Sequence, residues 1–153
     1  VDEFNRGCNG AGEPVYATIT GDAAGVAAVA LRHGWRDAGF RDFDEFRLTA
    51  GPTGSIHVEY ESELESRIRI RTTTDCLDWE SADTAVVVPC GSAVLNAVIT
   101  PGTDFVISIM PMQYMPAWGF APAEFDGMLR VTGLAVGVPT EGTSWGTIKG
   151  LFR

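Results

Sequence analysis

Alternating apolar and polar residues recur along most of the chain and predict a series of short β-strands. Turns rich in glycine and proline, of which the chain has 18 and 8, separate them. One segment is ambiguous, because Asp22 could cap a helix from Ala23, but Gly25 and Gly34 would each cost it about 1 kcal/mol relative to alanine. We therefore prefer a strand there. Outside the hairpin described next, the predicted strands are Val15–Thr20, Val26–Arg32, Phe43–Thr49, Thr84–Val88, Ser92–Thr100, Asp104–Met110 and Met128–Val138.

The clearest alternation runs from Ser55 to Thr72 and predicts a β-hairpin. Folding its two halves antiparallel about Ser62–Ser66 places Glu59 opposite Arg69. The same register gathers opposite charges on one face and apolar pairs on the other, which cross-strand pairing favours. The apolar positions are Ile56, Val58, Tyr60, Ile68 and Ile70.

Eight or nine short strands, each with one apolar face, predict an all-β domain. A two-sheet antiparallel β-sandwich is the expected fold, and a barrel is the alternative. The sandwich would span residues 15–142, between an N-terminal arm at 1–14 and a short amphipathic tail at 143–153.

The net charge of −9 changes the choice of partners. An acidic chain repels phosphate groups, so neither nucleic acid nor an anionic membrane surface is expected as a partner. No apolar run approaches the ~18 residues of a membrane span. Because the sequence begins at Val1 rather than methionine, we expect that a targeting segment has been removed or that the chain is an excised fragment.

Three cysteines indicate an oxidising compartment. Cys76 and Cys90 flank a short acidic stretch, and a disulfide between them would stabilise the fold by about 3 kcal/mol. Cys8 is then left over, either free or paired with another chain. An extracellular or cell-surface location is the expectation.

No catalytic constellation is visible in the sequence. The two histidines, His33 and His57, are a poor supply for acid–base or nucleophilic chemistry. Asp83-Thr84-Ala85 has the form of an aspartic-protease strand, but such enzymes need two copies, and the start of a strand explains it better. We expect the protein not to be an enzyme and to need no cofactor.

Two groups of residues leave ligand binding open. Tryptophans stack on sugar rings, which makes Trp79 and Trp35 candidates for glycan binding, with core packing as the alternative. Acidic loops can hold a structural calcium ion, although neither has the EF-hand spacing and a solvated loop is the preferred interpretation. The acids are Asp37, Asp42, Asp44 and Glu45 in one loop and Asp75, Asp78, Glu80 and Asp83 in the other.

Two stretches are typical of partner surfaces. Between Ile109 and Phe125, methionines, aromatics and prolines form a long apolar connection that either folds back on the core or forms an interface. In the tail, apolar residues recur at helical spacing behind a Thr-Ser cap. The candidate interface residues are Cys8, Met110, Met112, Tyr114, Met115, Trp118, Phe120, Trp145, Ile148, Leu151 and Phe152.

The final nine residues have the form Trp-Gly-x-x-Lys-x-x-Phe-Arg. This ending resembles the tail of uncharacterised secreted bacterial proteins, and residues 25–32 are similar to an early strand of cohesin-like secreted sandwiches. The resemblance implies export and a β-sandwich, and it implies no catalytic residue.

Together these features predict a non-enzymatic structural subunit of an extracellular assembly, such as a fibre or surface layer. Its partners would be copies of itself or another extracellular protein. The alternative is a carbohydrate-binding or adhesion module that uses exposed tryptophans.

Overall fold

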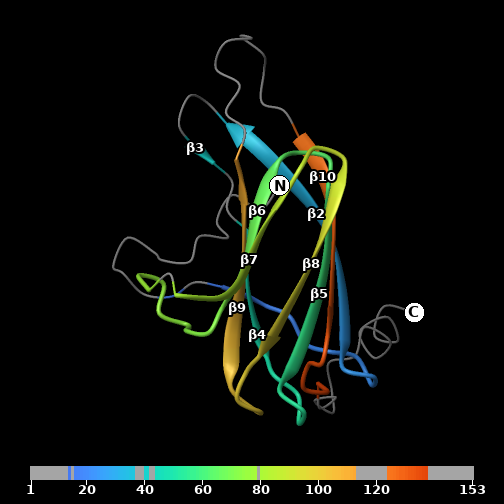
Figure 1. Ribbon diagram of the computed structural model, residues 1–153, viewed down its shortest axis with the longest axis vertical. Helices are drawn as coiled ribbons and strands as arrows, with labels where there is room; N and C mark the ends of the chain where they lie inside the picture. The colour runs from blue at the N-terminus through green and yellow to red at the C-terminus, as the bar shows by residue number, and fades with distance from the viewer. Residues whose placement is uncertain are drawn as a thin grey trace, which may run out of the picture.

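The computed structural model describes residues 14, 16–36, 40–41, 44–78, 80–112 and 124–137, which form two β-sheets packed face to face (Figure 1). Sheet I contains, in spatial order, β1 (Ala17–Thr18), β4 (Asp44–Thr49), β9 (Asp104–Pro111), β6 (Ser66–Arg71) and β7 (Ser81–Val87). Sheet II contains β3 (Phe40–Arg41), β2 (Val26–Arg36), β10 (Glu124–Thr132), β5 (Ser55–Ser62) and β8 (Gly91–Val98). All pairings are antiparallel except that of β1 with β4, and the part of the chain that the structure describes has no helix. The predicted β-sandwich is confirmed.

The strand order is that of a jelly roll. We number the strands other than the two-residue β1 and β3 from one to eight along the chain. Sheet II then has the order one, eight, three, six, and sheet I has the order two, seven, four, five. This order belongs to the eight-stranded jelly roll, in which two Greek keys are wrapped around one core.

The core lies between the sheets and is built from the apolar face of each strand. Alternation along β5 buries Ile56, Val58 and Tyr60 and leaves the residues between them exposed or half-buried, as predicted. Other fully enclosed members are Leu48, Ile68, Ile70, Leu95, Phe105, Ile107, Ile109 and Leu129.

The predicted hairpin between Ser55 and Thr72 is wrong. Both halves are strands, but β5 pairs with β8 and β10 in sheet II, and β6 pairs with β7 and β9 in sheet I. Glu59 therefore lies opposite Val94 and Arg130 instead of Arg69. Alternation specifies which face of a strand is buried, and an arch between two sheets buries the same residues as a hairpin within one sheet.

Short polar side chains make this arch possible. The Tyr60 hydroxyl donates to Ser66 Oγ at 3.3 Å, and the hydroxyls of Ser62 and Ser66 lie 3.1 Å apart. Ser62 Oγ accepts from the Leu64 amide at 3.1 Å, and Ser66 Oγ donates to the Leu64 carbonyl at 2.8 Å. The buried polar groups of the crossing are thus hydrogen-bonded, while the Leu64 side chain is itself buried.

Strand boundaries differ from the prediction where turns intervene. β1 is shorter than Val15–Thr20, β2 continues to Arg36, and β3 was not predicted. β10 ends at Thr132 because Gly133 has a φ of 90°, and a Cβ there would lie 1.9 Å from the Ser55 carbonyl oxygen. The predicted tail and all of the predicted arm except Pro14 lie outside the described residues.

Candidate functional site

Two edge strands meet on the same side of the sandwich and expose apolar side chains. β7 ends sheet I and β8 ends sheet II, and the Asn96 amide of β8 donates to Asp83 Oδ2 of β7 at 3.0 Å. Four valines on these strands and their connection are exposed to solvent. They are Val86 (51%), Val88 (64%), Val94 (58%) and Val98 (84%).

The outer edge of β8 has the properties of a strand that pairs with another chain. Because the Asn96 amide points towards β7, period-two geometry directs the main-chain groups of Val94 and Val98 to the same side, away from β5. β8 contains no charged residue and no proline, which are the usual means of preventing edge pairing. We call this outer edge of β8, which Val94 and Val98 flank on the outer face of sheet II, the valine edge; Val86 is exposed on the outer face of sheet I and Val88 in the connection between β7 and β8.

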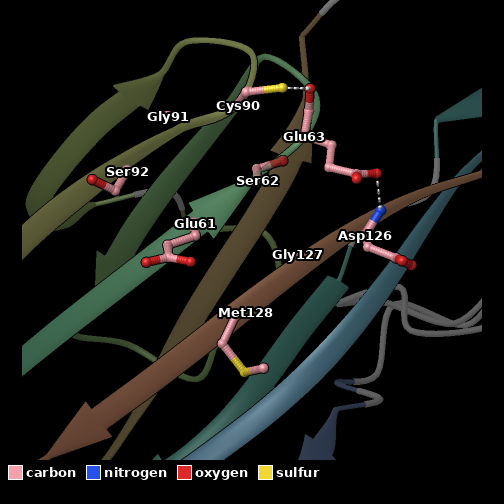
Figure 2. A pocket seen from close by; sticks show the side chains of 9 residues that line it. All are labelled: Glu61, Ser62, Glu63, Cys90, Gly91, Ser92, Asp126, Gly127 and Met128. Atoms are coloured by element: carbon pink, nitrogen blue, oxygen red, sulfur yellow. Dashed lines mark hydrogen bonds between the residues drawn. The ribbon is translucent and has the colours of Figure 1, made fainter.

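An acidic pocket of about 610 Å³ lies where β5, β8 and β10 meet (Figure 2). Its charged residues are Glu61, Glu63 and Asp126, and the Met128 side chain lies beside them. Glu63 Oε2 accepts from the Asp126 amide at 3.0 Å, while the Asp126 carboxylate lies 3.3 Å from Arg32 Nε. This pocket therefore has a net negative charge.

A basic pocket of about 510 Å³ lies on the outer face of sheet I. Arg67 and Arg69 of β6 line it together with Thr84 and Val86 of β7. Burial lowers the pKa of the Arg69 guanidinium, and the positive charges of Arg67 and Arg71 lower that pKa further. The field at this pocket is thus positive, although the whole chain carries −9.

Next to the basic pocket, Arg71 is fully buried on the same outer face. Its Nη1 lies 2.9 Å from Glu45 Oε1, which also accepts from Ser108 Oγ at 3.0 Å. The guanidinium also donates to the main-chain carbonyls of Asp75 and Asp78, so it fixes the 72–78 loop over the sheet. Glu45 was interpreted as part of a solvated loop, and this interpretation is wrong because Glu45 is buried against Arg71.

Tyr16 also binds the 72–78 loop. Its hydroxyl donates to the Thr74 carbonyl at 3.0 Å. Burial raises the pKa of the Tyr16 phenol, and the nearby Arg71 guanidinium opposes that rise. A single buried arginine thus supplies the positive charge around which this loop is organised.

The described residues of the two acidic loops are not gathered into a metal site. Within the described residues, no group of three or more histidine, cysteine or acidic side chains could hold a metal ion. Asp75 and Asp78 each accept a hydrogen bond from an amide two residues further along, and their carbonyls bind Arg71 instead. Asp44 and Glu45 are buried, Glu80 is exposed, and Asp37 and Asp42 lie outside the described residues.

The predicted disulfide between Cys76 and Cys90 is wrong. Cys90 is free and exposed, in a left-handed turn with a φ of 57°, and its Sγ lies 4.0 Å from the Glu63 carbonyl oxygen (Figure 2). Cys76 is buried and disulfide-bonded. The short separation between Cys76 and Cys90 in the sequence suggested that they pair. In the fold, however, Cys76 lies in the 72–78 loop and Cys90 lies in the turn between β7 and β8, which are different parts of the structure. The remaining cysteine, Cys8, lies outside the described residues.

Of the other predicted site residues, the structure describes Met110, Met112 and Trp35. Met110 and Met112 are half-buried at the end of β9, where the Met112 amide donates to the Glu65 carbonyl at 2.8 Å. Trp35 lies on β2 with its Cα opposite that of Arg41. The predicted residues outside the description are Tyr114, Met115, Trp118, Phe120, Trp145, Ile148, Leu151, Phe152 and Trp79.

His57 lies on the outer face of sheet II. Its Nδ1 lies 2.8 Å from Asn96 Oδ1, and its Nε2 lies 3.7 Å from Glu59. The alternation of residues along this strand predicted this outward-facing position.

The valine edge and the basic pocket were missed by sequence reasoning. Alternate valines in an uncharged strand indicate an exposed apolar strand face, and only the sheet order shows that this strand is an edge. Among the residues that the structure describes, no helix is long and apolar enough to cross a membrane.

Comparison of the chain with known protein families, curated proteins and solved structures found no match.

Proposed function

We propose that the chain is a non-enzymatic structural subunit of an extracellular assembly, and that copies associate through the valine edge. The observation that carries this proposal is the uncharged outer edge of β8, where Val94 and Val98 are exposed, next to the exposed Val86 of β7 and Val88 of the connection. An exposed, uncharged edge is a template for a further strand, and soluble monomers usually block such edges. In the part of the chain that the structure describes, the Asn96 amide is the only main-chain group of β8 that is hydrogen-bonded to a side chain.

The jelly-roll order supports an assembling role by analogy. This architecture recurs in capsid subunits as well as in lectins, so it suits both an assembly and a ligand-binding module. Fold alone does not decide between them. The valine edge favours assembly, because apolar side chains on an open strand are suited to another strand more than to a polar sugar.

The test is light scattering over a concentration series, with electron microscopy of large species. The wild-type chain should form species that grow with concentration. Val94→Lys should abolish the large species, because a lysine on the edge opposes strand addition. The matched control is Val136→Lys, at a residue that is exposed to a similar extent (53%) but lies in an isolated bridge with Gly21.

Circular dichroism must show that both variants remain folded. A wild-type chain that stays monomeric at high concentration would contradict the assembly proposal. Glycan-array binding by such a monomer would favour the carbohydrate-binding alternative. Equal assembly by the two lysine variants would show that the valine edge is not the contact.

A further inference from the structure

Sheet II has a second open edge, on the side of β2. The sheet ends in β8 on one side and, on the other, in β2 with the two-residue β3 beyond it (Figure 1). β3 pairs with β2 only at Trp35 and Arg36. In the part of the chain that the structure describes, no strand pairs with this side of β2 over residues 26–34. This length of β2 is therefore open to another strand.

The open side of β2 has the same properties as the valine edge. Residues 26–31 include no charge and no proline, so the usual obstacles to edge pairing are absent. The Val26 amide donates to Asp22 Oδ1 and its carbonyl accepts from the Asp22 amide, so both point away from β10. Period-two geometry directs the main-chain groups of Ala28 and Ala30 to the same side. The small side chains of these alanines are exposed, which leaves room for larger neighbours.

We propose that the valine edge of one copy pairs with this open side of β2 in the next copy. The inference rests on the proposed function, because it names the surface that the valine edge binds. Sheet II then continues from copy to copy as one antiparallel sheet.

Strand direction allows this contact to repeat. Each neighbouring pair among β2, β10, β5 and β8 is antiparallel, so β2 and β8 run in opposite directions. A copy that keeps its orientation therefore presents β2 antiparallel to the β8 of the copy before it. Because the contact joins two different edges, it builds an open filament unless a rotation closes a ring. Four strands spaced about 4.8 Å apart predict a rise of about 19 Å per copy.

Strand length and alternation select the register. β8, Gly91–Val98, fits opposite residues 26–33 of β2, short of the positions that β3 covers, and a one-residue shift would misalign the main-chain groups. Val94 then lies opposite Ala30, where a branched side chain beside a small one fits without crowding. Asn96 lies opposite Ala28. Although the Asn96 amide is bonded to Asp83, its carbonyl can accept from the Ala28 amide of the next copy.

Two copies of β8 fit each other less well. A two-fold axis that placed Val94 opposite Val98 of the other copy would pass through Asn96. Since each Asn96 amide lies 3.0 Å from an Asp83 carboxylate oxygen, two carboxylates would face each other across the axis. Such a dimer would also be closed and would leave no valine edge for further growth.

Single lysines on the two edges test which surfaces meet. In the full-length chain, Val94→Lys blocks the valine edge and Ala30→Lys blocks the open side of β2, because an edge lysine opposes strand addition. Each variant alone should remain monomeric in sedimentation velocity. An equimolar mixture should form dimers and nothing larger, since one contact is intact and both outer ends of the dimer are blocked.

The matched control is Met128→Lys. Met128 is exposed (46%) and lies opposite Ala30, but its strand, β10, is paired on both sides. This variant should therefore assemble like the wild-type chain. Circular dichroism shows whether each variant is folded, and Ala28→Lys provides a second block of the β2 side if Ala30→Lys is unfolded.

Disulfide cross-linking tests the register. The variants carry Cys90→Ser, which removes the exposed free thiol. A Val94→Cys chain mixed with an Ala30→Cys chain should form a cross-linked heterodimer on oxidation, because the Cα atoms of a hydrogen-bonded pair lie about 5.5 Å apart, within disulfide range. A mixture of Val94→Cys and Val98→Cys chains should give no such product.

Three outcomes would overturn this inference and leave the proposed function intact. Ala30→Lys assembles like the wild-type chain, the mixture of lysine variants stays monomeric, or Val94→Cys cross-links to Val98→Cys. The last outcome would identify β8 of a second copy as the occupant of the valine edge. A wild-type chain that stays monomeric at high concentration would instead defeat the proposed function, and this inference with it.

Discussion

Replacing Glu45 by glutamine would leave the Arg71 guanidinium charged and buried without its carboxylate. Arg71 is fully buried, and Glu45 Oε1 lies 2.9 Å from it. Removing one partner of such a pair costs about 3–5 kcal/mol, because the other charge stays desolvated and uncompensated. With a urea m-value of about 2 kcal/mol/M, the unfolding midpoint should fall by about 2 M.

Urea unfolding followed by circular dichroism measures this shift. The matched control is Glu59→Gln, because Glu59 forms an exposed pair with Arg130 at 3.2 Å. Surface pairs contribute about 0.2–1 kcal/mol, so this control should scarcely move the midpoint. The double variant Glu45→Met with Arg71→Met should be more stable than Glu45→Gln, since it buries no unpaired charge and water can reach the carbonyls of the exposed Asp75 and Asp78.

A midpoint shift of Glu45→Gln no larger than that of Glu59→Gln would refute this reasoning. It would mean that the 72–78 loop opens readily and that water reaches the Arg71 guanidinium. Hydrogen exchange of the loop amides would then be fast as well.

Three further predictions follow from local geometry. Hydrogen bonds from Thr49 and Arg47 lower the pKa of the Asp104 carboxyl in the folded chain. The stability that these bonds contribute is therefore complete above about pH 4 and is lost as pH falls through the folded-state pKa. In an NMR titration, Thr49→Val should raise the pKa of Asp104. Gly133→Ala should lower stability by several kcal/mol more than Gly102→Ala in thermal unfolding, because both glycines have positive φ but only at Gly133 would the Cβ collide with backbone. Thiol titration of the folded, non-reduced chain should find one reactive cysteine, and this reactivity should be lost in Cys90→Ser. Peptide mapping should link Cys76 to the one other cysteine, Cys8. A Cys76 thiol as reactive as that of Cys90 would contradict this prediction.

The strands and their buried faces could be predicted from the sequence because alternation is local. Ile56, Val58 and Tyr60 are buried as the pattern indicates, and so are Ile68 and Ile70. The partners of these strands could not be predicted in the same way. The arch at Ser62–Ser66 and a hairpin there satisfy the same alternation, so only contacts made far along the chain distinguish them.

The candidate site was harder to predict because it depends on what covers each outer face. Glu45 and Arg71 look like ordinary outward charges until the 72–78 loop is placed over them. The disulfide was misassigned for a related reason, since proximity in sequence stood in for proximity in space. The uncharged β8 was visible in the sequence, but its position at an edge depends on sheet order.

The places of β9 and β10 determine when this domain can fold during synthesis. They are the last two strands of the described chain, yet β9 lies between β4 and β6 in sheet I and β10 lies between β2 and β5 in sheet II. Neither sheet can join its two halves until these strands have left the ribosome. Earlier strands must wait as separate, partly apolar segments until β9 and β10 emerge, and folding is then dominated by slow, non-local pairing. A chaperone that holds extended apolar segments would act in this interval, and a ribosome stalled before Glu124 would carry a chain that is still open to proteases.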